Sequence, residues 1–368
     1  MPTPTPRTLP PLPVDAGIPP GPTPGPRRWK PLPGILLGVA WLGAAGTACT
    51  TPAPPALPER GSVEELETRR ALFLVSPDEL MSLREEGDAS LVILEVGSDP
   101  EIFQTEGHVA GAHFLPWESV AMERGGLPNQ VPPLDLLADR LRERGVTDAS
   151  RIVLYDRGAG LRAGRAWAVL DSVGLGAQTR LLDGQLAGWL GAGGEVAQGS
   201  PDAPTPGELS LTPDPGVILS GDRVADLVWA RSTQSPASLH DLHLLDARPA
   251  EEFSGEIPGG GVVRPGHIPG ARNLPWRTTL GPDDAPFFLD AAALQSLFAE
   301  VGVEPGSPVV TYCRTGGQAG QLYFVARMLG HEARFYDGSF VEWSGDSERP
   351  IVPPAATDSP ELLPQDTP

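Results

Sequence analysis

One cysteine stands where a buried strand is predicted to run into a helix through a glycine-bearing loop. The β-branched run from Val309 to Thr311 predicts the strand, and Cys313 lies at its end. Apolar residues at helical spacing between Leu322 and Leu329 predict the helix, which ends at Gly330. We therefore expect the thiol at the mouth of a loop whose N–H groups converge ahead of a helix N-terminus, which favours an anion. Since the thiolate is the nucleophilic form of cysteine, the pattern indicates a nucleophile.

The loop after the cysteine suits this role because none of its residues must act through its side chain. Its backbone N–H groups form a predicted cradle for negative sulfur, and two glycines let the chain curl close to the thiol. The residues of this predicted binding loop are Arg314, Thr315, Gly316, Gly317, Gln318 and Ala319. The structural alternative is that Cys313 is one more buried small apolar residue, which is the commoner role of a free cysteine.

Composition and charge bound the class of protein. The chain has 368 residues, 40% of them hydrophobic, which is enough for two domains with real cores. Its formal net charge of -20 argues against nucleic-acid binding and against a polybasic membrane patch, although the local potential of one loop can still favour an anionic substrate. The two cysteines lie in very different contexts, so we expect neither a structural disulfide nor a zinc site, and no metal or cofactor is predicted.

Residues 1–58 resemble an export segment. A proline-dense lead precedes an apolar run over 35–45, which is shorter than the ~20 residues of a comfortable membrane span. The basic residues before that run are Arg27, Arg28 and Lys30. Gly46-Thr47-Ala48-Cys49 is similar to a bacterial lipobox, although Gly46 stands where Leu is usual. This similarity implies a signal peptide and a periplasmic or cell-envelope lipoprotein, with Cys49 as the lipidation candidate and a proline-rich tether after it. A plain cleaved signal and an uncleaved anchor are the alternatives.

The rest of the chain divides into two segments in which strand and helix patterns alternate. These segments cover residues 71–192 and 217–349. A stretch rich in Gly, Pro and Asp over 193–216 is the predicted linker between them. The proline-rich, acidic tail over 350–368 is predicted to be disordered.

The two segments are an internal repeat. The segment from Gly107 to Ala112 matches the segment from Gly266 to Ala271. Three further pairs match in the same order: Pro116-Trp117 with Pro275-Trp276, Gly145-Val146 with Gly302-Val303, and Asp183-Gly184 with Asp337-Gly338. The chain is thus predicted to be a duplicated α/β domain, each copy a parallel sheet with helices on both faces. Asp156 in the first copy stands where the second has Cys313. A carboxylate cannot replace a sulfur nucleophile, so only the second copy is expected to keep the chemistry.

These motifs resemble those of the two-domain rhodaneses, the thiosulfate and 3-mercaptopyruvate sulfurtransferases, over residues 72–349. The resemblance is carried by the Cys313 loop, by Asp246-Ala247-Arg248 with Glu252-Phe253, and by Gly266 to Asn273. It implies two tandem rhodanese-like domains, of which the second is catalytic. It also implies that Cys313 attacks the outer sulfur of a donor such as thiosulfate, expels sulfite and holds a persulfide until a thiol or cyanide accepts the sulfur.

Two arginines are candidates for binding the sulfonate of such a donor. Arg314 follows the cysteine, and Arg248 follows Asp246 at the end of another predicted strand. The alternative for Arg248 is structural, since a pair with Asp246 can tie down nearby backbone. The sequence departs from the best-known subfamilies at Gln318, where Arg, Thr or Ser is frequent, and at Glu252, where several thiosulfate enzymes have a substrate-binding Arg. Arg314 favours thiosulfate, but these departures leave the donor open.

Two other functions use the same elements. Phosphatases of this fold place an arginine six positions after the cysteine, where this chain has Ala319, so that function is disfavoured. The stronger rival is a non-catalytic sulfur-binding or redox-sensing module, in which Cys313 carries sulfur or is oxidised without turnover. The glycine-containing loop favours the enzyme, with a small-molecule sulfur donor and acceptor as its partners.

Overall fold

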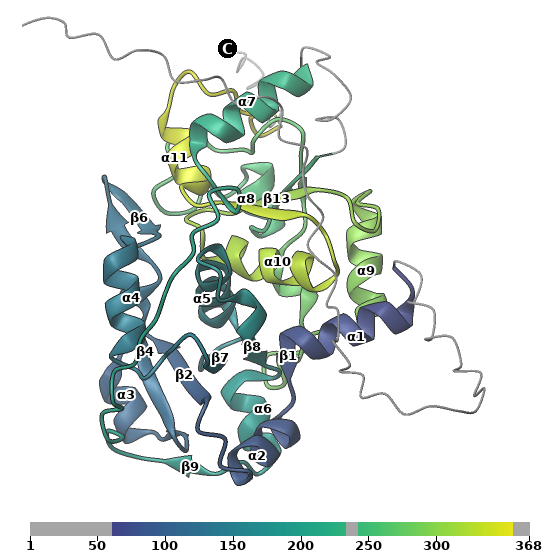
Figure 1. The fold of residues 1–368 in the computed structure, drawn as a ribbon. Helices are drawn as coiled ribbons and strands as arrows, with labels where there is room; N and C mark the ends of the chain where they lie inside the picture. Colours follow the sequence, from purple (N-terminus) through teal and green to yellow (C-terminus); the bar gives the residue numbers. More distant parts are fainter. Residues whose placement is uncertain (1–60, 233–241, 356–368) are drawn as a thin grey trace, which may run out of the picture. The chain divides into compact units, whose positions relative to one another are not determined.

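The computed structural model describes residues 61–232 and 242–355 of the chain (Figure 1). The expectations for the export segment, for Cys49 and for its tether lie outside these described residues, as does the tail beyond Ala355. Within the described part, no helix has both the length and the apolar character needed to cross a bilayer.

The first half is built on a five-stranded, all-parallel sheet with the strand order β1-β8-β7-β2-β4. Its strands are β1 (Leu74–Val75), β2 (Leu91–Gly97), β4 (Ala112–Pro116), β7 (Arg151–Tyr155) and β8 (Thr179–Leu182). Its helices are α1 (Val63–Phe73), α2 (Pro77–Glu85), α3 (Pro100–Thr105), α4 (Leu134–Arg142), α5 (Leu161–Ser172) and α6 (Gln185–Gly191). Two antiparallel pairs complete this half: β3 (His108–Val109) with β9 (Val196–Ala197), and β5 (Met122–Arg124) with β6 (Leu127–Gln130).

The second half repeats this sheet with the order β10-β14-β13-β11-β12, again all parallel. Its strands are β10 (Ile218–Leu219), β11 (His243–Asp246), β12 (Ala271–Asn273), β13 (Val309–Tyr312) and β14 (Ala333–Tyr336). Its helices are α7 (Gly221–Ser232), α8 (Ala250–Ser254), α9 (Ala291–Glu300), α10 (Gly317–Met328) and α11 (Ser339–Gly345). The two sheets correspond strand for strand, so the predicted duplication of an α/β domain is confirmed.

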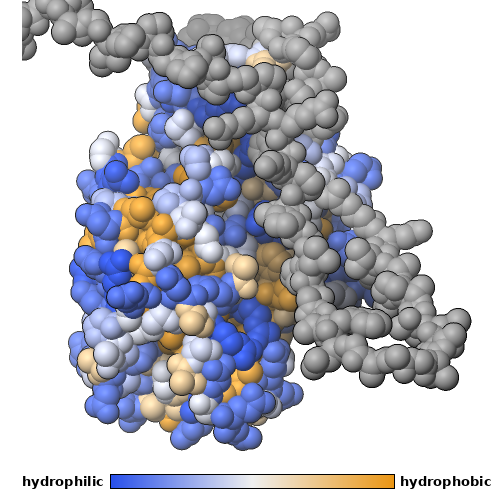
Figure 2. Space-filling model, viewed as in Figure 1, coloured by the Kyte–Doolittle hydropathy of each residue, from blue (hydrophilic) through white to orange (hydrophobic). Residues whose placement is uncertain are grey.

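Alternation along the strands divides the apolar side chains between the two faces of each sheet. In β2, Val92 and Leu94 belong to an inner cluster, whereas Ile93 belongs to an outer one. In β11, Leu245 lies in the same inner cluster and Leu244 in a separate outer one. The inner cluster is thus common to both halves, and α5 and α10 supply much of it. Helices cover both faces, as predicted, and the face seen in Figure 2 mixes apolar patches with hydrophilic side chains.

Glycines bring α5 and α10 into close contact at the centre of the inner cluster (Figure 1). A Cβ placed on Gly320 would lie 2.7 Å from the Cα of Arg165. A Cβ placed on Gly164 would lie 2.8 Å from the Cα of Gln321. Because there is no room for a methyl group at either position, glycine sets the distance between the two helices.

The predicted linker and the predicted disordered tail both contain paired backbone. Within the predicted linker over 193–216, Val196–Ala197 forms β9 and pairs with β3. In the predicted disordered tail, the N–H and C=O of Val352 exchange hydrogen bonds of 2.9 and 3.1 Å with His267. The prediction of disorder is therefore wrong for the first residues of the tail. Proline-rich composition gave no sign that this backbone would find a partner so far away in sequence.

We expect Gly164→Ala to lower the free energy of unfolding by about 1–3 kcal/mol, because the added methyl group overlaps the Gln321 backbone. This loss comes in spite of the roughly 1 kcal/mol that alanine gains over glycine inside a helix. Urea unfolding measures the change. Gly191→Ala is the matched control, since Gly191 ends α6 and has nothing within 4 Å of its Cβ position. Equal losses in the two variants would contradict the proposed close contact.

Candidate active site

Cys313 lies at the carboxyl end of β13, the central strand of the second sheet. It opens the short loop that leads into α10. Ligands of open parallel sheets bind at this edge, because the loops that follow neighbouring strands meet there. The strand, loop and helix occur in the predicted order, and the cysteine stands at the predicted point between them.

The loop directs a backbone donor at the sulfur. The N–H of Gly316 donates to Cys313 Sγ at 3.1 Å. Gly316 has a left-handed φ of 93°, and a Cβ there would lie 3.0 Å from the Asp337 carbonyl oxygen and 3.2 Å from Arg165 Nη1. Both the backbone angle and the lack of space therefore require glycine. Gly316 is also the N-cap of α10, so the positive end of the helix dipole faces the same loop.

The neighbouring turn after β14 fixes the backbone of the cysteine. The Cys313 N–H donates to Ser339 Oγ at 3.2 Å, and the Phe340 N–H donates to the Cys313 carbonyl at 2.9 Å. Ser339 has an unusual φ of 52° for a residue other than glycine. No sequence pattern marks Ser339 itself, although the Asp337-Gly338 landmark of the repeat stands directly before it. Two hydrogen bonds from this turn therefore hold the backbone of Cys313 in place.

The thiol is more deeply placed than the sequence suggested. Cys313 was expected at the mouth of its loop, but only 1% of the residue is exposed, and it belongs to the inner apolar cluster. The first half contributes to this cover, since a Cβ on Gly317 would lie 3.2 Å from Leu161 and 3.9 Å from Trp117. The expected position at the mouth of the loop is therefore wrong, because side chains of both halves cover the thiol.

Arg314 is paired with a carboxylate instead of standing free. Its Nη1 donates to Glu252 Oε1 at 3.1 Å, and 38% of its side chain is exposed. Gly259 packs over this pair, because a Cβ there would lie 2.8 Å from Glu252 Oε2 and 2.9 Å from Arg314 Cδ. The buried Glu252 Oε2 accepts no hydrogen bond from the described residues. A donor's sulfonate would thus compete with Glu252 for the Arg314 guanidinium.

Asp246 and Arg248 form a buried fork in which neither side chain is exposed. Arg248 Nε and Nη2 donate to the Asp246 carboxylate at 3.0 and 2.6 Å, and Nη2 also donates to the Gly266 carbonyl at 2.9 Å. Burial is the largest single effect and by itself would lower the pKa of Arg248, but the charge and hydrogen bonds of Asp246, together with the charges of Tyr312 and Glu252, raise it on balance. The fork ties the end of β11 to the turn at Gly266. This geometry matches the structural role that was the alternative for Arg248, in which its pair with Asp246 fixes nearby backbone.

The cysteine-lacking half shows what such a loop does with an anion. The Asp156 carboxylate accepts hydrogen bonds from the backbone N–H groups of Gly158, Gly160, Arg162 and Ala163 at 2.8, 3.0, 2.8 and 3.1 Å. Here the protein's own side chain fills the amide cradle at the start of α5. The corresponding amides at the start of α10 belong to Gln318 and Ala319, which are helix-start N–H groups without an acceptor inside the helix.

The first half also reaches into the Cys313 loop through residues that the sequence analysis missed. Asn129 Nδ2 donates to Thr315 Oγ1 at 2.9 Å, while Asn129 Oδ1 accepts from Trp117 Nε1 at 3.2 Å. Asn129 lies within the hairpin strand β6 and has a φ of 57°. No local pattern marks it. Arg165, in contrast, has a weak signal, because it is the one charged residue in the apolar sequence from Ala163 to Leu170.

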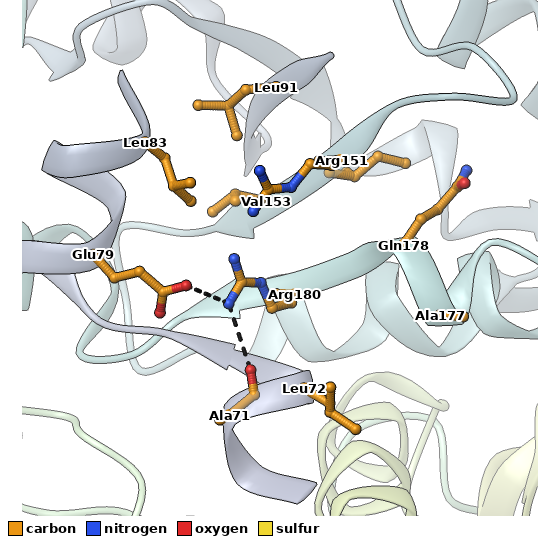
Figure 3. A pocket seen from close by; sticks show the side chains of 11 residues that line it. Ala71, Leu72, Glu79, Leu83, Leu91, Arg151, Val153, Ala177, Gln178 and Arg180 are labelled. Carbon is orange, nitrogen blue, oxygen red and sulfur yellow. Dashed lines mark hydrogen bonds and ion pairs between the residues drawn. The ribbon is translucent and has the colours of Figure 1, made fainter. Parts of the chain in front are cut away.

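A separate pocket of about 270 Å³ lies in the first half, away from this loop (Figure 3). Arg151 and Val153 from the early part of β7 line it, whereas Asp156 follows the other end of that strand. Its second arginine, Arg180, donates to Glu79 Oε1 at 2.7 Å and to the Ala71 carbonyl at 3.4 Å. No residue of the Cys313 loop lines this pocket, so it is not part of the candidate site.

The rhodanese-like domain model matches the chain twice, over residues 76–192 and 227–346. A putative thiosulfate sulfurtransferase, SseB of Mycobacterium tuberculosis, is 31% identical over 292 residues, which cover 77% of this chain and 97% of the relative. The 3-mercaptopyruvate sulfurtransferase of Escherichia coli is 30% identical over 250 residues, which cover 67% of this chain and 84% of the relative.

Solved structures agree with these sequence matches. The crystal structure of SseA from Escherichia coli, described as a 3-mercaptopyruvate sulfotransferase with the rhodanese fold, superposes with a TM-score of 0.61 at 26% identity. The match covers 73% of this chain and 98% of SseA. The resemblance inferred from the motifs is therefore confirmed, and the chain belongs to the family of tandem-domain rhodaneses.

Proposed function

We propose that the protein is a sulfurtransferase that carries sulfur as a persulfide on Cys313. The observation that carries this proposal is the hydrogen bond of 3.1 Å from the Gly316 N–H to Cys313 Sγ, at the N-terminus of α10. The Asp156 carboxylate supports it by internal analogy. Its oxygens lie two bonds beyond Cβ, as would the terminal sulfur of a persulfide, and four backbone N–H groups bind them.

The proposed reaction has two displacement steps at sulfur. The Cys313 thiolate attacks the outer sulfur of thiosulfate, the sulfur–sulfur bond of the donor breaks, and its electron pair leaves with sulfite. The transferred sulfur stays negatively charged as the end of the persulfide, where the N–H groups of Gly316, Gln318 and Ala319 stabilise it. A thiol or cyanide then attacks this terminal sulfur, and the Cys313 thiolate is restored.

The donor is proposed to be thiosulfate or 3-mercaptopyruvate, since the named relatives include enzymes of both kinds. With mercaptopyruvate the same attack releases pyruvate, and the thiol proton of the donor ends on its methyl carbon. Both donors are small, which suits a sulfur as buried as that of Cys313. The Arg314–Glu252 pair beside the loop is expected to influence which anion is accepted.

A second candidate is a sulfur-binding or redox-sensing module without turnover. The burial of Cys313 favours it, because a thiol with 1% exposure can keep a bound sulfur away from solvent acceptors. Such a module would hold one added sulfur atom but would not release it to cyanide or thiols. Turnover therefore separates the two candidates.

We expect the full chain to form thiocyanate from thiosulfate and cyanide, and Cys313→Ser to reduce the rate to background, because serine cannot form a persulfide. Intact-mass spectrometry after incubation with thiosulfate alone should show the gain of one sulfur atom in the parent protein and none in the variant. A stable added sulfur without turnover on thiosulfate, mercaptopyruvate or polysulfide would favour the sensing module. Turnover that persists in Cys313→Ser would contradict the proposed nucleophile.

We expect Glu252→Gln to lower KM for thiosulfate about 5-fold, the equivalent of roughly 1 kcal/mol, because the Arg314 guanidinium loses its carboxylate partner and can bind the donor. Steady-state kinetics of thiocyanate formation measure this. Glu251→Gln is the matched control: it makes the same charge change one residue earlier on α8, at an exposed position. The specific role of Glu252 is ruled out when both variants change KM equally or neither does.

The proposed location is the periplasm or cell envelope, with a lipid on Cys49. It is supported only by the sequence of residues 1–58. Metabolic labelling with a lipid precursor in a bacterial host should label the chain, and Cys49→Ser should abolish the label, because the thiol is the attachment point. Catalysis should be unaffected in that variant. An unlabelled mature form that fractionates away from membranes would exclude the anchor.

A further inference from the structure

Arg165 is a completely buried charge on α5, inside the half that lacks the cysteine. Its exposed fraction is 0%, and its guanidinium lies 4.8 Å from the centre of the Phe335 ring. Nε donates to the Val120 carbonyl at 3.2 Å, and Nη2 donates at 2.7 Å to both the Asn129 carbonyl and Asp337 Oδ1. Burying an arginine costs free energy, so its retention in an apolar helix calls for a role.

Its bond to Asp337 links the first half to the turn that holds the nucleophile. Asp337 precedes Gly338 and Ser339, and Ser339 accepts the Cys313 N–H. The other Asp337 oxygen accepts the Val131 N–H at 2.8 Å, so two bonds from the first half fix this carboxylate. The position of the turn beside Cys313 therefore depends on residues of the opposite half.

The remaining nitrogen of the Arg165 guanidinium lies next to Gly316, whose N–H donates to Cys313 Sγ. Arg165 Nη1 is buried and has no hydrogen-bond partner among the described residues. It is 3.2 Å from the point where a Cβ on Gly316 would stand, and Gly316 is the residue whose N–H points at Cys313 Sγ. An unpaired positive N–H group is thus packed directly against the loop that would hold negative sulfur.

We propose that Arg165 is a positioning residue for Cys313, supplied by the half that has no nucleophile of its own. It acts through two contacts: it fixes the Asp337 turn that holds the Cys313 backbone, and it places an uncompensated N–H beneath Gly316. In a site with little solvent, a fixed positive group near the loop stabilises the thiolate and the persulfide relative to their neutral forms. The effect on turnover rests on the proposed sulfur transfer, whereas the effect on thiol ionisation does not.

The test compares full-length variants in a Cys49→Ser background, so that Cys313 is the only thiol. Iodoacetamide alkylation is followed as a function of pH, because the pH of half-maximal rate reports ionisation while the high-pH plateau reports access. In Arg165→Met we expect the profile to move to higher pH by about one unit, since the anion loses a nearby positive group. We expect kcat for thiocyanate formation to fall on the order of 10-fold, with KM for thiosulfate changed less than about 2-fold.

Arg165→Lys serves as the conservative rescue. Lysine keeps the charge but cannot reproduce the fork to Val120, Asn129 and Asp337, so it should restore part of the pH shift and part of kcat. The double variant Arg165→Met/Asp337→Asn leaves no unpaired buried carboxylate. If Arg165→Met alone does not fold, this double variant is tested in its place. Its half-maximal alkylation rate should still occur at a higher pH than that of the parent.

Arg70→Met is the matched control for a general loss of contacts between the halves. Arg70 pairs with Asp183 at 2.6 Å, the repeat counterpart of Asp337, and donates to the carbonyls of Phe288 and Leu289 in the second half. Its variant should lose stability in urea but keep the parent pH profile. A parent-like profile and kcat in folded Arg165 variants, or equal shifts in Arg70→Met, would overturn the proposal. If the pH profile of alkylation changes in the Arg165 variants but neither the parent nor any variant forms thiocyanate, the positioning role of Arg165 stands and the proposed sulfur transfer is rejected.

Discussion

The rest of the structure depends on the convergence of backbone N–H groups at the start of a helix that follows a central parallel strand. The duplicated chain builds this cradle twice. In the first half, Asp156 fills it with its own carboxylate. In the second half, the connection from Cys313 to Gly316 is shorter, and the Gly316 N–H donates to Cys313 Sγ. The first N–H groups of α10 then have no acceptor inside the helix. The same local geometry is thus permanently occupied in one copy and open to chemistry in the other.

The half without a nucleophile is nevertheless part of the candidate site. Trp117 and Leu161 pack over the cysteine loop, Asn129 binds Thr315, and Arg165 binds Asp337. Glycines on α5 and α10 permit this, since the two helix backbones approach within the space of a methyl group. Duplication has therefore produced one composite candidate site, in which one copy supplies the cysteine and the other supplies part of its surroundings.

Sequence patterns were sufficient for the duplication, for the parallel sheets and for the place of Cys313, because each depends on residues close together in the chain or on the repeat itself. They were insufficient for Asn129 and Arg165, whose bonds to the cysteine side of the molecule span 186 and 172 residues. The same limitation hid the depth of the thiol, since its cover comes from the other half. It also hid the pairing of Val352 with His267, where composition suggested disorder. Contacts of this kind leave no periodic trace in a sequence.

The shared inner cluster has an evolutionary consequence. Because α5 and α10 bury apolar side chains against each other, separating one copy from the other would expose an apolar surface to water. Once duplication had created this arrangement, loss of the copy without cysteine would have exposed the apolar face of α10 to water. A duplicate without the cysteine can therefore be retained for the apolar surface that it covers on its partner.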